Sequence, residues 1–265
     1  NKIINDLGID IVVELVGGYS PAKDYIMQAI RNGKHVVTAN KAVISEYGHE
    51  IFALAKEKKV NVGFEGAVAG GIPIINPLLD QLSIGKISSI TGILNGTTNF
   101  ILTRMSEGMA YGEALKIAQE RGFAEADPAF DVEGLDAAQK IAILAYLAFN
   151  TWINPKQVYC EGITKITPID IEYARELGYA IKLLAIAKKT GEGNIDIRVH
   201  PALIDKNHRL AKVNEEFNAI YIQGSPFDEY FNVGKGAGQG PTAFSVFYDI
   251  IKIAEMIRTN TLREI

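Results

Sequence analysis

The sequence has one cysteine and no long apolar run, and both absences narrow the class of protein. Cys160 has no second thiol among the 265 residues, which excludes a disulfide within the chain and disfavours a cysteine-based metal site. A low cysteine content is typical of a reducing compartment, so we expect a cytoplasmic protein. No run of about 18 apolar residues is present, which predicts no membrane span. The start at Asn1 shows no signal-peptide pattern.

An excess of positive charge is also lacking. The formal net charge is −4, so the composition does not indicate a nucleic-acid-binding surface. The histidines show no metal-ligand spacing, and Cys160 lies in an alternating, strand-like stretch with no histidine near it in sequence. We interpret Cys160 as a packing residue. Hydrophobic residues make up 48% and charged residues 22%, which is ordinary for a folded protein.

The first part of the chain alternates strands and helices. Residues 10–15 form a short β-branched run, the apolar residues of 22–30 share one helical face, and residues 35–38 form a second run. The pattern then repeats, with Ser45 as the expected N-cap of a helix and residues 60–64 as the next strand. Two such units in succession predict a doubly wound, parallel α/β sheet.

The organisation changes after Pro73. Strands are predicted at residues 87–94, 195–199 and 219–223. We expect a turn into a helix at residues 95–105, and further helices at residues 112–119, 134–149, 169–188 and 241–258. This content predicts an α+β domain over residues 73–240. Residues 1–72, joined by the carboxyl-terminal helix within 241–265, are then the remaining part of a dinucleotide-binding domain.

The stretch from Ala124 to Lys140 is rich in carboxylates. Asp131 is a candidate cap for a helix starting near Val132, while Asp136 and Lys140 are four residues apart and share a helix face. Spacing alone also allows a capped helix with an exposed ion pair. However, residues 141–149 are nearly all apolar, so this helix should be buried on most sides. A lysine heading a buried helix among carboxylates favours a wet cleft.

Three loops are further candidates. Lys41, in residues 38–42, follows a strand at the carboxyl edge of the α/β sheet, where ligands bind in such sheets; a surface lysine is the alternative. Residues 65–74 leave a strand through small residues whose carbonyls suit a hard cation, although composition alone favours a tight hinge. Residues 234–243 alternate glycine before Pro241. They could approach a cofactor or anion closely, and a flexible loop is the alternative.

Together these stretches resemble homoserine dehydrogenase. The segments at residues 36–42 and 92–105 look like that family, and the resemblance runs from about Asp10 to Ile253. The substrate-site signature of the family is matched at its spacing by Ala124-Glu125-Ala126-Asp127-Pro128, Asp131, Gly134-Leu135-Asp136 and Lys140.

The resemblance implies a fold, a reaction and a set of roles. The fold is a Rossmann-like, doubly wound parallel sheet plus an α+β substrate and dimerisation domain. The reaction interconverts L-homoserine and L-aspartate 4-semialdehyde with NAD or NADP, in threonine, methionine and isoleucine biosynthesis. A homodimer or higher homo-oligomer and a bound sodium ion are also implied. The implied residues are Lys140 and Lys41 for catalysis; Glu125, Asp131, Asp136 and Lys41 for substrate; Val16, Gly17, Lys41 and Gly240 for cofactor; and Glu65, Val68, Gly70 and Ile72 for sodium.

The sequence departs from the family in one respect. The amino-terminal strand and its Gly-x-Gly-x-x-Gly loop, which cradle the pyrophosphate, are not among these residues. A catalytically silent oligomeric fragment without a dinucleotide site is therefore the alternative reading. Aspartate-semialdehyde dehydrogenase is rejected, because it needs a cysteine nucleophile in a glycine-flanked loop and Cys160 lies in a strand-like run.

Overall fold

The structure is a computed structural model that describes residues 2–191, 193–263 and 265. It divides into two compact units, residues 1–81 with 237–265 and residues 82–236. The predicted dinucleotide-binding domain, residues 1–72 with 241–265, includes residues 1 and 264, which lie outside the described residues. Among the described residues, no helix combines the length and apolar character that crossing a bilayer requires.

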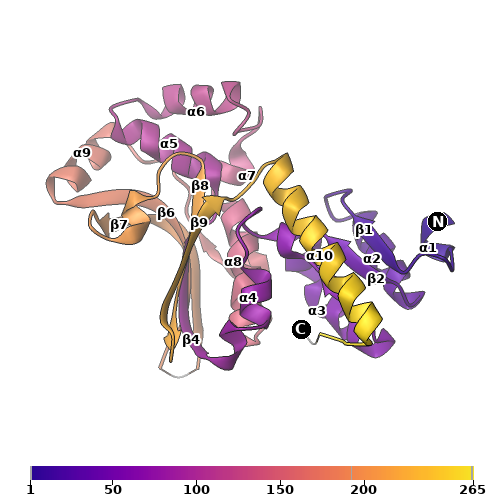
Figure 1. The fold of residues 1–265 in the computed structure, drawn as a ribbon. Helices are drawn as coiled ribbons and strands as arrows, with labels where there is room; N and C mark the ends of the chain where they lie inside the picture. Colours follow the sequence, from indigo (N-terminus) through magenta and orange to yellow (C-terminus); the bar gives the residue numbers. More distant parts are fainter. Residues whose placement is uncertain (1, 192, 264) are drawn as a thin grey trace. The chain divides into compact units, whose positions relative to one another are not determined.

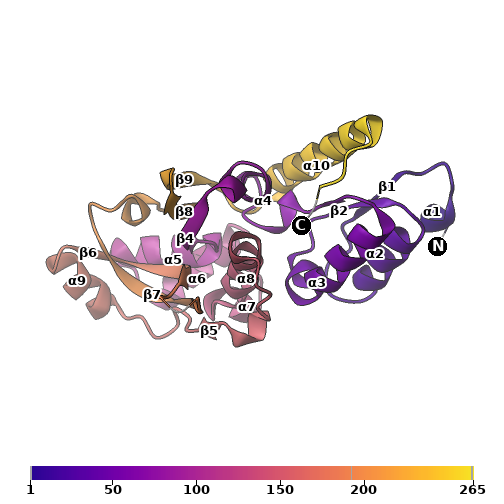
Figure 2. The ribbon, with the colours of Figure 1, turned by 90° about the horizontal axis from the view of Figure 1, so that it is seen from below.

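The first unit is a parallel α/β layer structure. Its three strands pair in the order β1-β2-β3, in parallel, with Val12 opposite Val36 and Val36 opposite Val62. The sheet lies between the pair α2 and α3 and the long helix α10 (Figures 1 and 2). The elements are α1 (Lys2–Asn5), β1 (Ile11–Glu14), α2 (Ala22–Arg31), β2 (His35–Thr38), α3 (Lys41–Lys58), β3 (Val62–Gly63), the 3-10 turn η1 (Glu65–Ala67), α4 (Ile75–Leu79) and α10 (Gln239–Thr259).

The second unit is built on a six-stranded sheet in the order β5-β7-β6-β4-β8-β9, antiparallel except for the β5-β7 pair. Helices α5 and α8 pack against its central strands. Its elements are η2 (Leu82–Ile84), β4 (Lys86–Ile93), α5 (Gly96–Ser106), α6 (Tyr111–Glu120), α7 (Ala129–Val132), α8 (Leu135–Phe149), η3 (Pro155–Gln157), β5 (Tyr159–Cys160), α9 (Pro168–Glu176), β6 (Tyr179–Lys189), β7 (Ile195–Asp205), η4 (Arg209–Lys212), β8 (Phe217–Ser225) and β9 (Asp228–Lys235).

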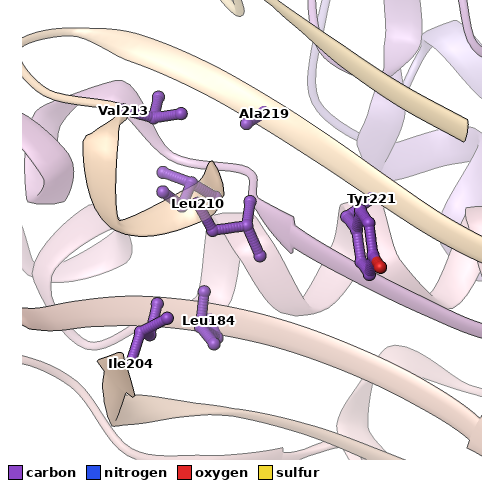
Figure 3. Close-up of a cluster of buried hydrophobic side chains, with 7 residues drawn as sticks. Leu184, Ile204, Leu210, Val213, Ala219 and Tyr221 are labelled. Carbon is purple, nitrogen blue, oxygen red and sulfur yellow. The ribbon is translucent and has the colours of Figure 1, made fainter. Parts of the chain in front are cut away.

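One part of the second unit's core is closed by the short turn η4. Leu210 of that turn is fully buried and lies with Leu184 and Ile204 on one side and Ala219 and Tyr221 on the other (Figure 3). The cluster joins side chains of β6, β7 and β8, so it packs η4, in the connection between β7 and β8, against the middle of the sheet. Burial of this kind contributes roughly 1.5–3 kcal/mol for each large apolar side chain.

The α/β and α+β fold class is confirmed, while one predicted helix and one predicted helix cap in these units are wrong. The helix expected at residues 169–188 ends at Glu176, because Gly178 adopts a positive φ and the chain continues as β6. That strand pairs along its full length with β7 and also pairs with β4, and this tertiary pairing overrides local helix propensity. Ser45 is not an N-cap but lies inside α3, whose cap is Asn40. Strand β9 was not predicted.

The boundary between the units also differs from the sequence-based one at residues 72 and 73. The buried carboxylate of Glu65 accepts hydrogen bonds from the backbone N–H groups of Ile74, at 2.5 Å, and Ile75, at 2.8 Å. These bonds tie the segment after residue 72 to the first unit, which therefore extends to Gln81. At the other end the division falls at residues 236 and 237 rather than 240 and 241.

Lys182 of β6 is a buried cation that fastens α5 to the loop after η4. It is 3% exposed and donates to Asn99 Oδ1 at 3.0 Å, Val213 O at 2.6 Å and Asn214 Oδ1 at 3.0 Å. Burial lowers the pKa of this ammonium to about 8, against an opposing effect of the negative charge on Glu215. The folded state therefore holds the Lys182 proton less tightly than the unfolded chain does.

Lys182→Met should remove a pH dependence of stability. Below pH 8 both states of the wild type carry the proton; between about pH 8 and 10.5 the unfolded state binds more protons, so wild-type stability rises with pH. The free energy of unfolding of the wild type relative to Lys182→Met should rise across that window by up to about 3 kcal/mol. Urea unfolding at several pH values measures it. Lys188→Met, at the exposed end of the same strand, is the control, and equal slopes for the two variants would contradict the assignment.

Candidate functional site

The candidate site of the second unit is built where β4 leads into α5. The strand ends at Ile93, and Asn95 is the N-cap of the helix. Its side-chain Oδ1 accepts from the Thr98 backbone N–H at 2.8 Å and from Thr98 Oγ1 at 2.9 Å. An Asn cap satisfies one of the backbone donors that a helix start leaves open. The junction is thereby held in one geometry, with Leu94 O turned toward α8.

Helix α8 supplies an ion pair to this junction. Lys140 Nζ lies 2.7 Å from Asp136 Oδ2 and 2.7 Å from Leu94 O. Asp136 is 2% exposed and Lys140 is 7% exposed, so the pair is buried. The alternative of an exposed ion pair is wrong. The apolar run of the same helix explains the burial, since residues 137–145 are buried throughout.

Asn95 joins a second carboxylate to the pair. Its Nδ2 donates to Asp131 Oδ1 at 2.7 Å and to Asp136 Oδ2 at 2.9 Å. Asp131 lies within the short helix α7, and α8 begins after Gly134, so the prediction that Asp131 caps the helix is wrong. We define Asn95, Asp131, Asp136 and Lys140 as the polar cluster. The sequence predicts a turn into a helix at this segment but gives no signal that singles out Asn95.

The polar cluster has the groups that proton transfer requires. A lysine amine accepts or donates a proton, and it is held by one carboxylate and one backbone carbonyl. Two carboxylates near one cation also suit the binding of a substrate ammonium group. Glu125 is exposed in the loop between α6 and α7, where its carbonyl accepts from Gln119 Nε2 at 3.1 Å.

Two of the predicted cofactor residues, Val16 and Gly17, follow the carboxyl end of β1, beside that of β2. Glu14 Oε1 accepts from the N–H groups of Val16, at 2.6 Å, and Gly17, at 3.3 Å, while Glu14 Oε2 accepts from Thr38 Oγ1 at 2.7 Å. Val16 is exposed, and Gly17 has a φ of 80° with open space where a side chain would stand. A buried carboxylate thus shapes the edge where α/β sheets bind ligands.

Lys41 and Gly240 are both helical, which differs from the loops expected. Lys41 is the first residue of α3, directly after the Asn40 cap, because Asn40 Oδ1 accepts from Val43 N–H at 3.2 Å. Gly240 lies in the first turn of α10, where nothing occupies the space a side chain would take. Both residues belong to the first unit and the polar cluster belongs to the second.

The predicted sodium loop, residues 65–72, holds its one carboxylate in internal hydrogen bonds. Glu65 accepts from the N–H groups of Ile74, Ile75 and Asn76 and from the Asn76 side chain. Gly70 O accepts from Ser245 Oγ at 2.7 Å. Among residues 2–191, 193–263 and 265, no three His, Cys, Asp or Glu side chains gather as a metal site would require. The sodium site, with Glu65, Val68, Gly70 and Ile72 as ligands, therefore stays a prediction. Its ligands from these residues would be backbone carbonyls.

Cys160 agrees with its interpretation as a packing residue. It lies in β5, with Sγ 3.2 Å from Glu133 O, and burial raises the pKa of its thiol to about 11. A thiol with a raised pKa is a poor nucleophile at neutral pH. His35 Nδ1 accepts from Asn61 N–H at 2.9 Å, and burial lowers the pKa of the His35 imidazole.

Two family models match the chain. The homoserine dehydrogenase NAD binding domain matches residues 1–65, and homoserine dehydrogenase matches residues 73–251. The homoserine dehydrogenase of Neisseria gonorrhoeae is 51% identical over 258 residues, which cover 97% of this chain and 59% of that protein. That of Synechocystis is 52% identical over 262 residues, covering 97% of this chain and 60% of the relative. The chain therefore spans about three fifths of the curated relatives it matches.

Solved structures agree. A homoserine dehydrogenase from Thiobacillus denitrificans superimposes with a TM-score of 0.94 at 47% identity, covering 97% of this chain and 59% of that one. A hyperthermophilic archaeal homoserine dehydrogenase mutant, in complex with NADPH, gives a TM-score of 0.83 at 31% identity, with 96% and 74% covered.

The buried pair predicts strong coupling in stability. Asp136→Asn and Lys140→Met should each cost about 3–5 kcal/mol of unfolding free energy, because each leaves a buried charge without its partner. The double variant should cost less than their sum by more than about 1 kcal/mol. Lys116 and Glu120 of α6 form a matched exposed pair at the same spacing, for which the coupling should be at most about 0.5 kcal/mol. Urea unfolding of both cycles measures the difference; equal coupling would contradict the buried arrangement.

Proposed function

The chain belongs to the homoserine dehydrogenase family, and on that premise we propose that the protein interconverts L-homoserine and L-aspartate 4-semialdehyde with NAD or NADP. The observation that carries the proposal is the buried Lys140, held by Asp136 and Leu94 O at the start of α8. The family's signature places its acid/base lysine at this position. The carboxylates of Asp131 and Asp136 lie in the same polar cluster, which supports the proposal.

Lys140 is proposed as the acid/base group. In the oxidation of homoserine, the hydride leaves the alcohol carbon and the hydroxyl proton passes to the Lys140 amine, forming the aldehyde. In the reverse direction the ammonium returns that proton to the aldehyde oxygen. The nicotinamide, when bound, supplies the hydride acceptor or donor. Asp136 Oδ2 and Leu94 O both contact the Lys140 amine. We propose that they hold it in one position for the forward and the reverse reaction.

The remaining substrate contacts are assigned by the family's motif. Glu125, Asp131 and Asp136 are proposed to hold the substrate ammonium and its water network, and Lys41 to lie near substrate and nicotinamide. Support comes from the polar cluster, which already gathers two of the three carboxylates. The exposure of Glu125 leaves its carboxylate accessible to a bound amino acid.

The edge formed by β1 and β2 fits a dinucleotide. Val16 is exposed at this edge, and Gly17 leaves open space beside it, since a Cβ at Gly17 would meet nothing within 4 Å. We propose that this edge, Lys41 and Gly240 contact NAD or NADP. A sodium ion at residues 65–72 would be held by the main-chain oxygens of Glu65, Val68, Gly70 and Ile72, because the Glu65 carboxylate is already fully engaged.

We also propose a homodimer formed through the sheet of the second unit. Strand β9 is an edge strand, and Val233 on it is 48% exposed. Leu203 of β7, at 58% exposed, adds apolar surface to the same sheet. The alternative function, a catalytically silent oligomeric fragment, shares this interface but lacks a dinucleotide site and hence turnover, so the activity measurement separates the two.

Lys140→Ala should abolish turnover while the protein stays oligomeric. General acid–base catalysis contributes about a hundredfold or more, so the rate should fall at least that far. Reduction of NAD or NADP by L-homoserine, followed by absorbance, measures it, and circular dichroism monitors folding. Lys116→Ala, an exposed lysine of α6, is the control and should keep the full rate. Wild-type protein without turnover would favour the silent fragment, and a Lys140→Ala variant retaining more than about a tenth of the rate would remove Lys140 as the acid/base group.

Glu125→Gln should weaken homoserine binding more than it slows the chemical step. A carboxylate facing an ammonium contributes roughly 1.5–3 kcal/mol, so the Michaelis constant for homoserine should rise about 10- to 150-fold. The Michaelis constant for the dinucleotide should not change. Asp127→Asn, two residues along the same loop, is the control. An unchanged Michaelis constant for homoserine in Glu125→Gln would argue against the assigned contact.

A further inference from the structure

Asn95 uses both ends of its amide at the polar cluster. Nδ2 donates to Asp131 Oδ1 and Asp136 Oδ2, and Oδ1 accepts from the N–H and hydroxyl of Thr98. The orientation of the amide is fixed by its neighbours. Rotating it by 180° would set Oδ1 against two carboxylates and Nδ2 against the Thr98 N–H, and neither contact is a hydrogen bond. At 4% exposure, water cannot compensate for either loss.

We propose that Asn95 is a positioning residue for the reaction proposed above, and this inference rests on that proposed function. Its two N–H groups hold the carboxylates of α7 and α8 at a fixed separation, while its carbonyl ties both to the first turn of α5. Asp136 Oδ2 accepts from both Asn95 Nδ2 and Lys140 Nζ. The amide therefore decides which way the Asp136 carboxylate faces, and through it where the Lys140 amine stands.

The side-chain chemistry explains why this position needs an amide. Aspartate caps helices as well as asparagine does, so capping alone would accept either residue. Only asparagine also donates. An aspartate at residue 95 would keep the Thr98 contacts but would set a third carboxylate against Asp131 and Asp136. The charged groups facing this position are those two carboxylates and the Lys140 ammonium, from α7 and α8.

The test compares Asn95→Asp with Asn95→Ser in the full chain. Both retain an oxygen that can cap α5, and only the first adds charge. In Asn95→Asp, kcat/KM for homoserine oxidation should fall about a hundredfold. In the plot of kcat/KM against pH, the limb that rises with pH should move by about one pH unit or more to higher pH. The reason is that the added negative charge favours the protonated, inactive form of Lys140. In Asn95→Ser, kcat should fall about tenfold with a smaller displacement of the limb, since donors are lost without new charge.

Asn154→Asp is the matched control. Asn154 caps the turn η3 by accepting from Lys156 N–H at 2.9 Å, and no carboxylate of the described residues is hydrogen-bonded to its amide. That variant should keep the wild-type rate and pH profile. If Asn95→Asp also keeps kcat/KM within about twofold and its limb does not move, Asn95 is only a helix cap and the proposal is overturned.

Thermal unfolding separates this proposal from the proposed function, because it requires no turnover. A third carboxylate in the cluster would hold its proton more tightly in the folded state than in the unfolded chain. Stability would then be lost as pH rises above the ordinary aspartate range. The melting temperature of Asn95→Asp should fall progressively below that of the wild type between about pH 4 and 7. Equal melting temperatures throughout would overturn the positioning role, even where the wild type proves inactive.

Discussion

The buried ammonium of Lys140 sets the strictest condition on the second unit. An ion removed from water costs several kcal/mol unless charge and hydrogen bonds compensate for it. Here the compensation comes from Asp136, one turn earlier on α8, and from Leu94 O at the end of β4. A backbone carbonyl can serve only if the chain around it does not move. The strand–helix junction at residues 94–98 must therefore be rigid, and the Asn95 cap supplies that rigidity.

The next turn of α5 is fixed by a second buried cation. Lys182 reaches Asn99 on α5 and also the carbonyl of Val213, so the helix is attached to the loop after η4. Asn99 Nδ2 donates to Val213 O and Phe217 O, which adds the start of β8 to the same network. One helix thus carries polar anchors at residues 95 and 99, on consecutive turns. Buried networks of this kind are costly when partly satisfied, and they specify a single arrangement when complete.

The sequence predicted the Asp136–Lys140 pair because its signal is local. A spacing of four residues and the apolar run behind it are both visible within one helix. Asn95 could not be found this way, since its partners Asp131 and Asp136 lie 36 and 41 residues further along the chain. The error at residues 169–188 has the same origin. Residues 179–187 are apolar enough for either a buried helix or a central strand, and only the pairing with β4 and β7 decides between them.

In the first unit a carboxylate is used to shape backbone, and this limits what the loop at residues 65–72 can bind. The Glu65 carboxylate accepts hydrogen bonds from three consecutive N–H groups at the start of α4. Asp249 of α10 accepts from the Glu65 N–H at 2.7 Å. Burial raises the pKa of Asp249 to about 6. Asn76 bridges the two carboxylates, and Arg263 contacts Asn76 and Asp80. Because these oxygens are engaged, a cation here would meet main-chain carbonyls alone, a ligand set that suits a hard, singly charged ion better than a transition metal.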